Sequence, residues 1–430
     1  MTRVCVPVCE KTIDALETAA VRASEWADVV ELRLDCLDSL EGFERALNRV
    51  SRPVILTLRP SEQGGHRQLD QQARKAFWKT ALRTEWWDIE WDLTVETDLS
   101  NIIISHHDFA GVPNDLTRIY ERLAATRARV VKIAVQANDI VDCVPVFQLL
   151  DRARGEGRDL IAIAMGNAGL ATRVLGPSRG AFLTYGALEE ESATAPGQIT
   201  AQKLRSVYRI DNVDRDTMIC GLVGLPVMHS VSPHIHNAAF LNAGINGVYL
   251  PLEVRDVATF VKRMVHPRTR ELDWNLRGLS VTAPHKSAVL EHLDWIAPDA
   301  EEIGAVNTIV IEDDKLRGCN TDAAGFIEPL SKVFDSLNGV RAAVIGAGGA
   351  ARAATWALLK HNSTVTLFAR DDTKARVLGQ QFDVSCESLS SASSFANYDL
   401  VINATPLGSG ELFDQTAATA EQLHGARCVY

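Results

Sequence analysis

The sequence lacks the features that mark membrane, nucleic-acid-binding and disordered proteins. Its 430 residues contain no run of 18 apolar residues, so we expect no membrane-spanning helix. Acidic residues outnumber basic ones by 55 to 44, a net charge of −11, and no block of Lys and Arg occurs. Such a chain is a poor candidate for binding nucleic acid or an anionic membrane surface. A hydrophobic share of 46% excludes wholesale disorder.

The sequence also lacks a Cys-x-x-Cys pair and an N-terminal targeting segment. Its eight cysteines are scattered, and four lie in apolar, strand-like runs, as is typical where a reducing compartment uses cysteine as a small buried hydrophobe. Glu10 and Lys11 come too early for the apolar core of a signal peptide, and the first residues lack the Arg/Ser-rich character of a transit peptide. We therefore expect a soluble, cytoplasmic protein.

Short apolar runs alternate with amphipathic stretches through the first half of the chain. Eight strand–helix units in about 210 residues predict a compact (β/α)8 barrel. The alternative is an open doubly wound sheet, but that fold usually has fewer strands and a Gly-rich first loop, which is missing here. The expected strands are residues 4–8, 29–34, 54–58, 87–91, 102–105, 130–134, 160–165 and 182–185.

The second half shows the same alternation of apolar runs and amphipathic stretches, with different linker and turn sequences between them. The charged stretch 210–217 predicts a linker, and a glycine-rich turn follows a predicted strand at residues 341–345. The final apolar run, 427–430, stands where a doubly wound sheet would normally continue, so we expect the last domain to be truncated. We predict an α/β protein of three domains: a (β/α)8 barrel over 1–212, a substrate-binding domain over 216–327 and a Rossmann-like dinucleotide-binding domain over 328–430.

Polar side chains stand near the carboxyl ends of the predicted barrel strands, where such barrels bind ligand. Lys132 interrupts the apolar run VVKIAV, and burial there favours the neutral amine that imine formation with a ketone requires. A histidine after the preceding strand is a candidate general base, and arginines at neighbouring strand ends suit a carboxylate substrate. Alternatively, Lys132 extends to the barrel mouth or pairs with Glu31 or Glu90, and the histidine is structural.

Six motifs of this half, taken in order, resemble those of type I 3-dehydroquinate dehydratase. They are ELRLD (31–35), TLRP (57–60) followed by Gly64 and Gly65, SHHDF (105–109), VKIA (131–134), MGNAGLATR (165–173) and TAPGQ (194–198). The resemblance implies that Lys132 forms an imine with 3-dehydroquinate and that His107, which directly precedes the Asp-Phe pair, is the acid–base residue. It also implies a substrate site made of Glu31, Arg33, Arg59, Arg173, Thr194 and Gln198.

Two positions depart from the pattern of this family. Thr194 replaces a frequent serine and keeps the hydroxyl, whereas Gln63 replaces a frequent glutamate, a change that bears on loop closure over the substrate. The implied product is 3-dehydroshikimate. A class I aldolase shares the lysine imine but breaks a carbon–carbon bond, and the MGNAGLATR and TAPGQ motifs argue against it.

A glycine-rich turn, GAGGAAR (346–352), directly follows a predicted strand and opens a predicted helix. Such a turn lets the backbone approach a pyrophosphate at the helix N-terminus, although glycine-rich turns also serve strand–helix packing. The next strand ends at Arg370, where an acid would bind a free ribose 2′-hydroxyl and an arginine suits the 2′-phosphate of NADP. Lys374 adds charge, while Asp371 leaves NAD as the less favoured cofactor. The expected cofactor-binding residues here are Gly346, Gly348, Gly349, Ala350, Arg370 and Lys374.

Hydroxyls and histidines gather in the segment 224–240. Ser230 and Ser232 precede a predicted helix, where they can bind a polyol or a carboxylate, or simply cap the helix. The three histidines would suit zinc, but neither a cysteine nor an acidic cluster accompanies them, so we predict no metal. These histidines are His229, His234 and His236.

The second half resembles shikimate dehydrogenase over residues 218–430. Its motifs, in the family's order, are HSVSP (229–233), SVTAPHK (280–286), GAVNT (304–308), NTDAAGF (320–326), GAGGAAR (346–352) and NATPLG (403–408). The resemblance implies that Lys286 and Asp322 form the acid–base pair that protonates the carbonyl oxygen as hydride arrives. Ala369 stands where the family usually has Asn, which weakens the expected adenine-side binding. Substrate contacts are implied for Ser230, Ser232, Thr282 and Asn307, and cofactor contacts for Asn403 and Thr405.

The whole chain therefore resembles the bifunctional dehydroquinate dehydratase–shikimate dehydrogenases, with small-molecule substrates and NADPH as reductant. One alternative is a binding protein with inactive sites, which the presence of all four expected catalytic residues disfavours. Another is oxidation of quinate rather than shikimate. The oligomeric state is not indicated. Because members of the family continue into helices that return to the substrate domain, we expect a weak or silent dehydrogenase beside a barrel that dehydrates normally.

Overall fold

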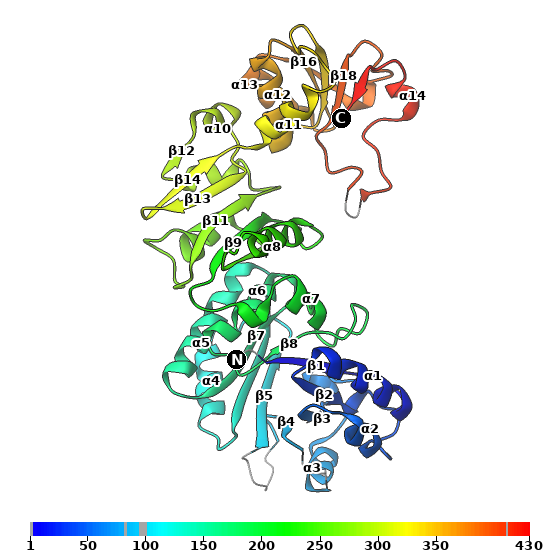
Figure 1. Ribbon diagram of the computed structural model, residues 1–430, viewed down its shortest axis with the longest axis vertical. Coiled ribbons are helices and arrows are strands. Elements are labelled where there is room, and N and C mark those ends of the chain that lie inside the picture. The colour runs from blue at the N-terminus through cyan, green and yellow to red at the C-terminus, as the bar shows by residue number, and fades with distance from the viewer. Residues whose placement is uncertain (1–2, 81–83, 94–100, 410–411) are drawn as a thin grey trace. The chain divides into compact units, whose positions relative to one another are not determined.

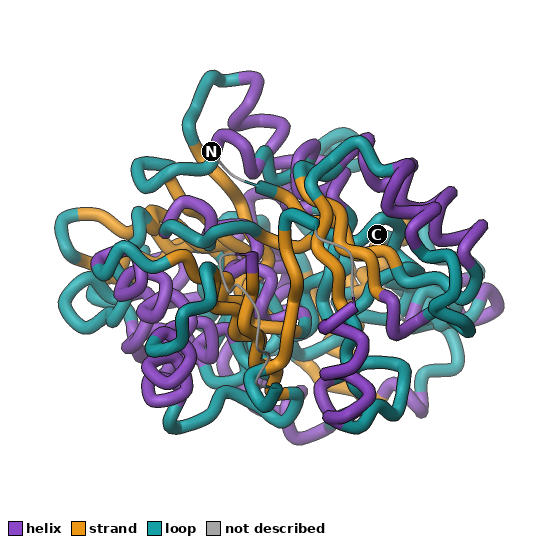
Figure 2. Tube along the Cα trace, turned by 90° about the horizontal axis from the view of Figure 1, so that it is seen from below, coloured by secondary structure: helices purple, strands orange, loops and turns teal. Residues whose placement is uncertain are grey.

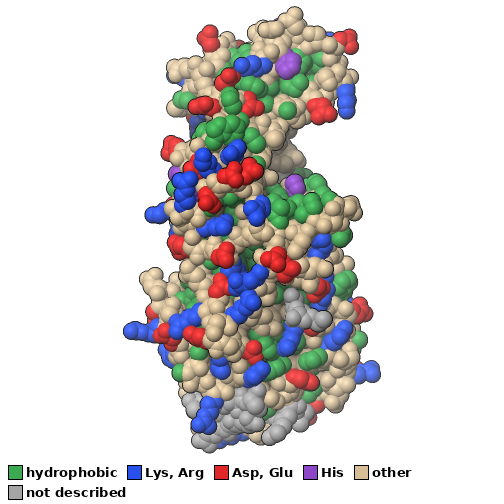
Figure 3. All heavy atoms as spheres, turned by 60° about the vertical axis from the view of Figure 1, so that its left-hand side comes forward, with side chains coloured by type: hydrophobic (Ala, Val, Ile, Leu, Met, Phe, Trp, Pro, Cys, Tyr) green, Lys and Arg blue, Asp and Glu red, His purple; other side chains and the backbone are tan. Residues whose placement is uncertain are grey.

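The computed structural model describes residues 3–80, 84–93, 101–409 and 412–430 (Figure 1). None of the described helices is long and apolar enough to cross a membrane. On the face drawn in Figure 3, acidic and basic side chains are interspersed rather than gathered by sign. The chain divides into two compact units: the first is Met1–Gly221, Ser230–Val265 and Thr269–Leu276, and the second is Leu222–His229, His266–Arg268 and Arg277–Tyr430.

Eight parallel strands form the predicted barrel, in the order β7-β6-β5-β4-β3-β2-β1-β8. The backbone N–H of Phe182 donates to the carbonyl of Leu160, so the segment that leads into β8 also reaches β7 and nearly closes the ring. The strands are β1 (Val4–Val8), β2 (Val29–Arg33), β3 (Val54–Thr57), β4 (Trp86–Glu90), β5 (Ile102–Asp108), β6 (Val130–Gln136), β7 (Asp159–Met165) and β8 (Thr184–Tyr185). The barrel prediction is confirmed.

Helices connect the barrel strands and cover their outer side (Figures 1 and 2). In α1, for example, the Thr12 hydroxyl accepts the Ala15 N–H at the start of the helix, and the face around Leu16 and Ala20 is buried. A helix expected between β4 and β5 falls partly on residues 94–100, outside the described residues. The described helices are α1 (Ile13–Trp26), α2 (Glu44–Arg49), α3 (Gln71–Thr80), α4 (Leu116–Ala124), α5 (Cys143–Gly155), α6 (Leu170–Leu175) and α7 (Ala201–Ser206).

The barrel interior is apolar near the start of its strands and polar near their ends. Most of the strands contribute a buried apolar side chain to one cluster, which includes Cys5, Val29, Ile55, Ile103, Val130 and Ile161. Apolar burial of this kind stabilises the fold by roughly 1.5–3 kcal/mol for each large side chain. The polar residues at the carboxyl ends of the strands lie next to this apolar cluster.

The next region is a six-stranded sheet in the order β10-β9-β11-β13-β14-β12. Asp313 and Asp314 both have positive φ, 50° and 56°, as a tight turn between the antiparallel strands β13 and β14 requires. The strands are β9 (Met218–Gly224), β10 (Gly247–Glu253), β11 (Leu276–Val281), β12 (Trp295–Ile296), β13 (Thr308–Glu312) and β14 (Lys315–Cys319). The helices are α8 (Ser232–Asn242), α9 (Val257–Phe260), α10 (Pro298–Ile303) and α11 (Asp322–Leu330).

The last region is a parallel five-stranded sheet in the order β17-β16-β15-β18-β19, with the strand order of a dinucleotide-binding fold. The predicted Rossmann-like fold is thus confirmed, and the final apolar run contains β19, which pairs with β18. The strands are β15 (Arg341–Ile345), β16 (Thr364–Ala369), β17 (Ser385–Ser388), β18 (Leu400–Asn403) and β19 (Cys428–Val429), and the helices are α12 (Gly349–Lys360), α13 (Asp372–Phe382) and α14 (Ala420–Leu423).

One prediction about the cysteines is wrong. Cys9 and Cys36 form a disulfide, with Cα atoms 5.4 Å apart, so they do not serve as small buried hydrophobes. The physical reason lies in the pairing of the first two strands. Cys9 directly follows β1 and Cys36 lies three residues beyond β2, and the parallel pairing of these strands brings their ends together. The other six cysteines are free.

Candidate active sites

A pocket opens at the carboxyl ends of the barrel strands, with about 450 Å³ of empty space that is partly open to solvent. All eight residues predicted for the barrel site line it, although they come from segments as far apart as residues 31 and 198. The lining polar residues are Glu31, Arg33, Arg59, His107, Lys132, Arg173, Tyr185, Thr194 and Gln198. The structure thus brings the whole predicted set together.

Lys132 is buried on β6 and points its amine into a cluster of oxygen atoms. Its Nζ donates to Asp88 Oδ2 at 2.6 Å and to the Tyr185 hydroxyl at 2.9 Å, and lies 3.9 Å from Glu31 Oε1. Burial alone would raise the pKa of Asp88, but the charges of Lys132 and Arg59 hold it well below its ordinary value. A permanent carboxylate therefore orients the amine.

Of the alternative partners named for Lys132, Glu90 is not the one that it contacts. Glu90 Oε2 instead accepts a hydrogen bond from Arg74 Nη1 of α3 at 3.0 Å. Burial raises the pKa of Glu90 to about 7, despite the neighbouring Arg59 and Arg74. The carboxylate that meets Lys132 belongs to Asp88, two residues earlier on the same strand, and the sequence analysis assigned it no role. Tyr185 was also missed, because an aromatic residue in an apolar strand carries no signal of a polar contact.

His107 lies at the end of β5 with its ring in the pocket. Its Nε2 is 2.5 Å from Arg59 Nη1, and its backbone N–H donates to Gln63 Oε1 at 3.3 Å. Burial and the positive charges of Arg59 and Lys132 lower the pKa of His107 well below its ordinary value. His107 is therefore a neutral imidazole, the form that accepts a proton. The neighbouring His106 is not among the residues that line the pocket.

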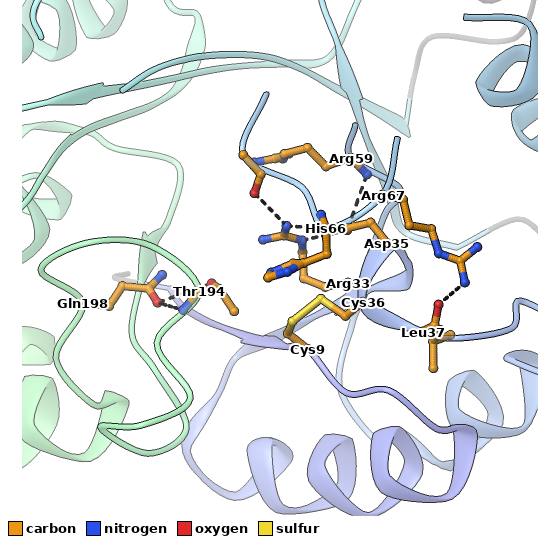
Figure 4. Close-up of a disulfide and its surroundings, with 11 residues drawn as sticks. Cys9, Arg33, Asp35, Cys36, Leu37, Arg59, His66, Arg67, Thr194 and Gln198 are labelled. Atoms are coloured by element: carbon orange, nitrogen blue, oxygen red, sulfur yellow. Dashed lines mark hydrogen bonds and ion pairs between the residues drawn. A yellow bond between two sulfur atoms is a disulfide. The ribbon is translucent and has the colours of Figure 1, made fainter. Parts of the chain in front are cut away.

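Arg173 places a buried guanidinium at the pocket. Its Nη2 donates to the carbonyl of Pro196 at 3.3 Å, its Nε has no hydrogen-bond partner among the described residues, and burial lowers its pKa to about 10. In the same loop the Thr194 N–H donates to Gln198 Oε1 at 2.8 Å (Figure 4). An arginine without a carboxylate partner suits an anionic ligand, since a buried unpaired charge is costly.

The second unit holds the predicted Lys–Asp pair. Lys286 Nζ lies 2.6 Å from Asp322 Oδ2, and Asn307 Nδ2 donates to the other carboxylate oxygen, Oδ1, at 2.7 Å. Asn307 Oδ1 also accepts the N–H of Thr321 at 2.9 Å. Thr282 directly follows β11 and donates its N–H to the carbonyl of Val223. The loop after β11, the start of β13 and the start of α11 thus build one polar cluster.

Ser230 and Ser232 belong to the first unit and contact each other. The Ser230 hydroxyl lies 3.1 Å from that of Ser232 and accepts the Ser232 N–H at 3.2 Å, at the start of α8. Of the three histidines that were weighed as zinc ligands, His236 stacks on Tyr249, with ring centroids 4.2 Å apart. Among the described residues the metal-like group of three donors is a different one: Cys9, Cys36 and His66.

The glycine-rich turn fits a dinucleotide. Gly346 has a φ of +130°, and a Cβ there would lie 2.7 Å from the carbonyl oxygen of Ala404. Gly348 has open space around it, and α12 begins directly after it at Gly349. The first N–H groups of a helix lack internal partners, and with Ala350 next in line this turn can present them to a pyrophosphate.

A side chain at Gly349 would meet Lys286. A Cβ there would lie 2.7 Å from Lys286 Cδ, so the lysine of the Lys–Asp pair packs directly on the glycine-rich turn. The turn and the acid–base pair are therefore one site within the second unit. Arg370 is exposed directly after β16, and Asp371 caps α13 by accepting the N–H groups of Thr373 and Lys374 at 3.1 Å.

The loop after β18 is held by its own side chains. Asn403 Oδ1 accepts the Thr405 hydroxyl at 2.6 Å, and Asn403 Nδ2 donates to the carbonyl of Leu407 at 2.9 Å. Asn403 and Thr405 thus shape the loop that lies beside Gly346 through Ala404.

Three family models match the chain: type I 3-dehydroquinase over residues 4–215, the shikimate dehydrogenase substrate binding domain over 222–309, and shikimate/quinate 5-dehydrogenase over 328–420. The bifunctional 3-dehydroquinate dehydratase/shikimate dehydrogenase, chloroplastic, of Arabidopsis thaliana is 30% identical over 454 residues, covering 98% of this chain and 74% of the relative. The shikimate biosynthesis protein AroDE of Chlamydia pneumoniae is 28% identical, covering 94% and 83%.

Among solved structures, shikimate 5-dehydrogenase of Thermus thermophilus in complex with NADP(H) and shikimate is 33% identical. The match has a TM-score of 0.43 and covers 49% of this chain and 77% of that one.

Proposed function

The chain belongs to the bifunctional 3-dehydroquinate dehydratase/shikimate dehydrogenase family, and from this premise we propose which residues carry each reaction. It dehydrates 3-dehydroquinate to 3-dehydroshikimate and reduces 3-dehydroshikimate to shikimate with NADPH. We assign the first reaction to the barrel and the second to the domains predicted over 216–327 and 328–430.

In the barrel, Lys132 is the nucleophile. The observation that supports this assignment is its buried amine, held by Asp88 and Tyr185 on the wall of the pocket. Once the Lys132 ammonium has passed a proton to solvent, its amine attacks the substrate ketone, and loss of water from the adduct gives an imine. A protonated imine withdraws electrons from the neighbouring carbon, so the proton there becomes acidic. His107, kept neutral by its surroundings, removes that proton.

The resulting enamine expels the β-hydroxyl group, and His107 returns its proton to the leaving oxygen as water forms. Hydrolysis of the imine then releases 3-dehydroshikimate and restores the Lys132 amine. We assign the substrate carboxylate to Arg173, whose guanidinium has no ion-pair partner among the described residues. The remaining wall groups, which bind the hydroxyls, are Glu31, Arg33, Arg59, Thr194 and Gln198.

In the second half, Lys286 and Asp322 form the acid–base pair at the carbonyl oxygen of 3-dehydroshikimate. NADPH, when bound, supplies the hydride. The Lys286 ammonium stabilises the developing alkoxide and gives it a proton, and Asp322, oriented by Asn307, holds the ammonium in place. We assign a further substrate contact to Thr282, and the pyrophosphate to the turn with Gly346, Gly348, Gly349 and Ala350.

The barrel assignment is tested by trapping. Borohydride added during turnover of 3-dehydroquinate reduces an imine to a stable amine, and peptide mapping by mass spectrometry then locates it. We expect the adduct on Lys132. An adduct on another lysine, or none during normal turnover, would contradict the assignment.

We expect the pH dependence of dehydration to follow His107. A base with a lowered pKa stays neutral to lower pH, so kcat/KM should remain constant down to a pH below the ordinary histidine value of 6.5. Arg59→Gln removes one of the charges that lower this pKa, and its acid limb should move to higher pH at reduced activity. An acid limb of the unmodified enzyme at or above 6.5 would show that another group titrates.

We expect NADPH to be used in preference to NADH, because Arg370 follows β16 where the ribose 2′-position of the cofactor lies. Asp371 is occupied in capping α13, and Lys374 adds positive charge beside it. Arg370→Ala should raise KM for NADPH about tenfold and leave KM for NADH nearly unchanged. Arg376→Ala, an exposed arginine of the same helix region, is the matched control. Equal losses for both cofactors would remove Arg370 from the 2′-phosphate site.

A further inference from the structure

The disulfide lies beside the substrate pocket of the barrel. Cys9 directly follows β1, and Cys36 ends the short 3-10 helix η1 (Leu34–Cys36) that follows β2. Because β1 and β2 pair in parallel, the disulfide joins the carboxyl ends of two neighbouring strands, next to Arg33 (Figure 4). Both cysteines are half-buried and so lie outside the fully buried core of the barrel.

Asp35 links the disulfide to Arg33. It directly precedes Cys36, is fully buried, and accepts two hydrogen bonds from Arg33, from Nε at 2.9 Å and from Nη2 at 2.8 Å. It also accepts the backbone N–H of Arg59 at 3.4 Å and of His66 at 3.1 Å. One carboxylate thus aims the Arg33 guanidinium and ties it to the segment that carries Arg59.

The position of Asp35 depends on the backbone of η1, which is three residues long. The disulfide fastens the last residue of η1 to the end of β1, while a single backbone bond, from the Asp38 N–H to the Lys11 carbonyl at 2.8 Å, joins the same two segments beyond it. Breaking the disulfide therefore removes a covalent restraint one residue away from the carboxylate that holds Arg33.

His66 supplies a group that assists thiol exchange. The two sulfur atoms and one ring nitrogen of His66 all lie within 4.8 Å of one another. A thiolate is the attacking species in disulfide exchange. A neighbouring imidazole promotes thiolate formation, because it can accept the proton of the thiol. The backbone of His66 is fixed to Asp35, so the imidazole stays near the sulfur atoms.

We propose that Cys9 and Cys36 form a thiol–disulfide site that sets the affinity of the barrel for 3-dehydroquinate through Asp35 and Arg33. A dithiol reductant gives two electrons and two protons to the disulfide, which yields two thiols while the reductant becomes a cyclic disulfide. A low-molecular-weight disulfide reverses the step. The inference rests on the proposed role of Arg33 in substrate binding, and it leaves the chemistry at Lys132 untouched.

The test compares the full chain after treatment with reduced dithiothreitol or with oxidised glutathione. Alkylation and peptide mass spectrometry establish the state of Cys9 and Cys36, and initial rates then give KM and kcat for dehydration. We expect reduction to raise KM about fivefold and to change kcat less than about twofold, because a loosened binding group costs affinity rather than chemistry. Borohydride trapping on Lys132 should succeed in both states.

Matched variants separate this disulfide from the other cysteines. The double variant Cys9→Ser/Cys36→Ser should keep the KM of the reduced enzyme in both buffers, whereas Cys428→Ser, a half-buried free cysteine elsewhere, should respond as the unmodified chain does. Four results would overturn the proposal: both cysteines alkylated after oxidation, an unchanged KM after verified reduction, a loss confined to kcat, or a redox response in the double variant. Failure to trap any Lys132 adduct would instead contradict the proposed dehydratase site.

Discussion

Replacing Lys132 by methionine or alanine should abolish dehydration of 3-dehydroquinate, with a fall in kcat of roughly 10⁴-fold or more. The amine is the atom that becomes covalently attached to the substrate, and the other described lining residues of the pocket include no second lysine that could replace it. Methionine is the sharper variant, because its unbranched chain fills most of the volume that the lysine stem leaves.

The barrel should fold without Lys132. Asp88 keeps its second partner, since Arg59 Nη2 donates to Asp88 Oδ2 at 2.8 Å, so the variant does not leave an unpaired buried carboxylate. Lys203→Met, which removes a half-buried lysine paired with Glu190, controls for the loss of a charge. Circular dichroism and melting temperature report folding. Dehydration above one hundredth of the unmodified rate in a folded variant would reject imine catalysis by Lys132.

The pocket could be predicted from the sequence because a parallel barrel places all its strand ends on one face. Lys132 interrupts an apolar run and Arg59 follows another, so both had to face a polar space at that end. Which carboxylate meets the lysine could not be predicted in the same way. Asp88 and Glu90 lie on the same strand with similar charge, and only the side-chain geometry decides that Asp88 contacts Lys132 while Glu90 contacts Arg74.

The disulfide shows a second limit of sequence reasoning. Cys9 and Cys36 are 27 residues apart and belong to no recognisable cysteine motif. They become neighbours only because Val8 pairs with Leu32 across β1 and β2, a register that spacing alone does not reveal. The contact between Gly349 and Lys286 is similar. Both motifs were visible in the sequence, but their packing against each other depends on how β11 and α12 approach in space.

That contact leads to the second large effect, on the dehydrogenase reaction. Lys286→Met should lower the rate of 3-dehydroshikimate reduction about 10³-fold, because it removes the group that gives the alkoxide its proton. The methionine keeps an apolar stem against the glycine-rich turn, so KM for NADPH should change less than about twofold. The measurement is the loss of NADPH absorbance under steady state, with dehydration by the same chain as the internal control.

A variant of the turn separates the position of Lys286 from its chemistry. In Gly349→Ala the new Cβ would lie 2.7 Å from Lys286 Cδ, so the lysine side chain must shift, and kcat for reduction at saturating NADPH should fall although every catalytic group is present. Gly325→Ala, with open space around its Cβ, is the matched control for Gly349→Ala. Lys360→Met, which removes a lysine from α12, is the matched control for Lys286→Met. If Gly349→Ala reduces 3-dehydroshikimate at the unmodified rate, the packing of Lys286 on the glycine-rich turn does not affect the reaction. A Lys286→Met enzyme that retains a tenth of the rate would show that another group supplies the proton.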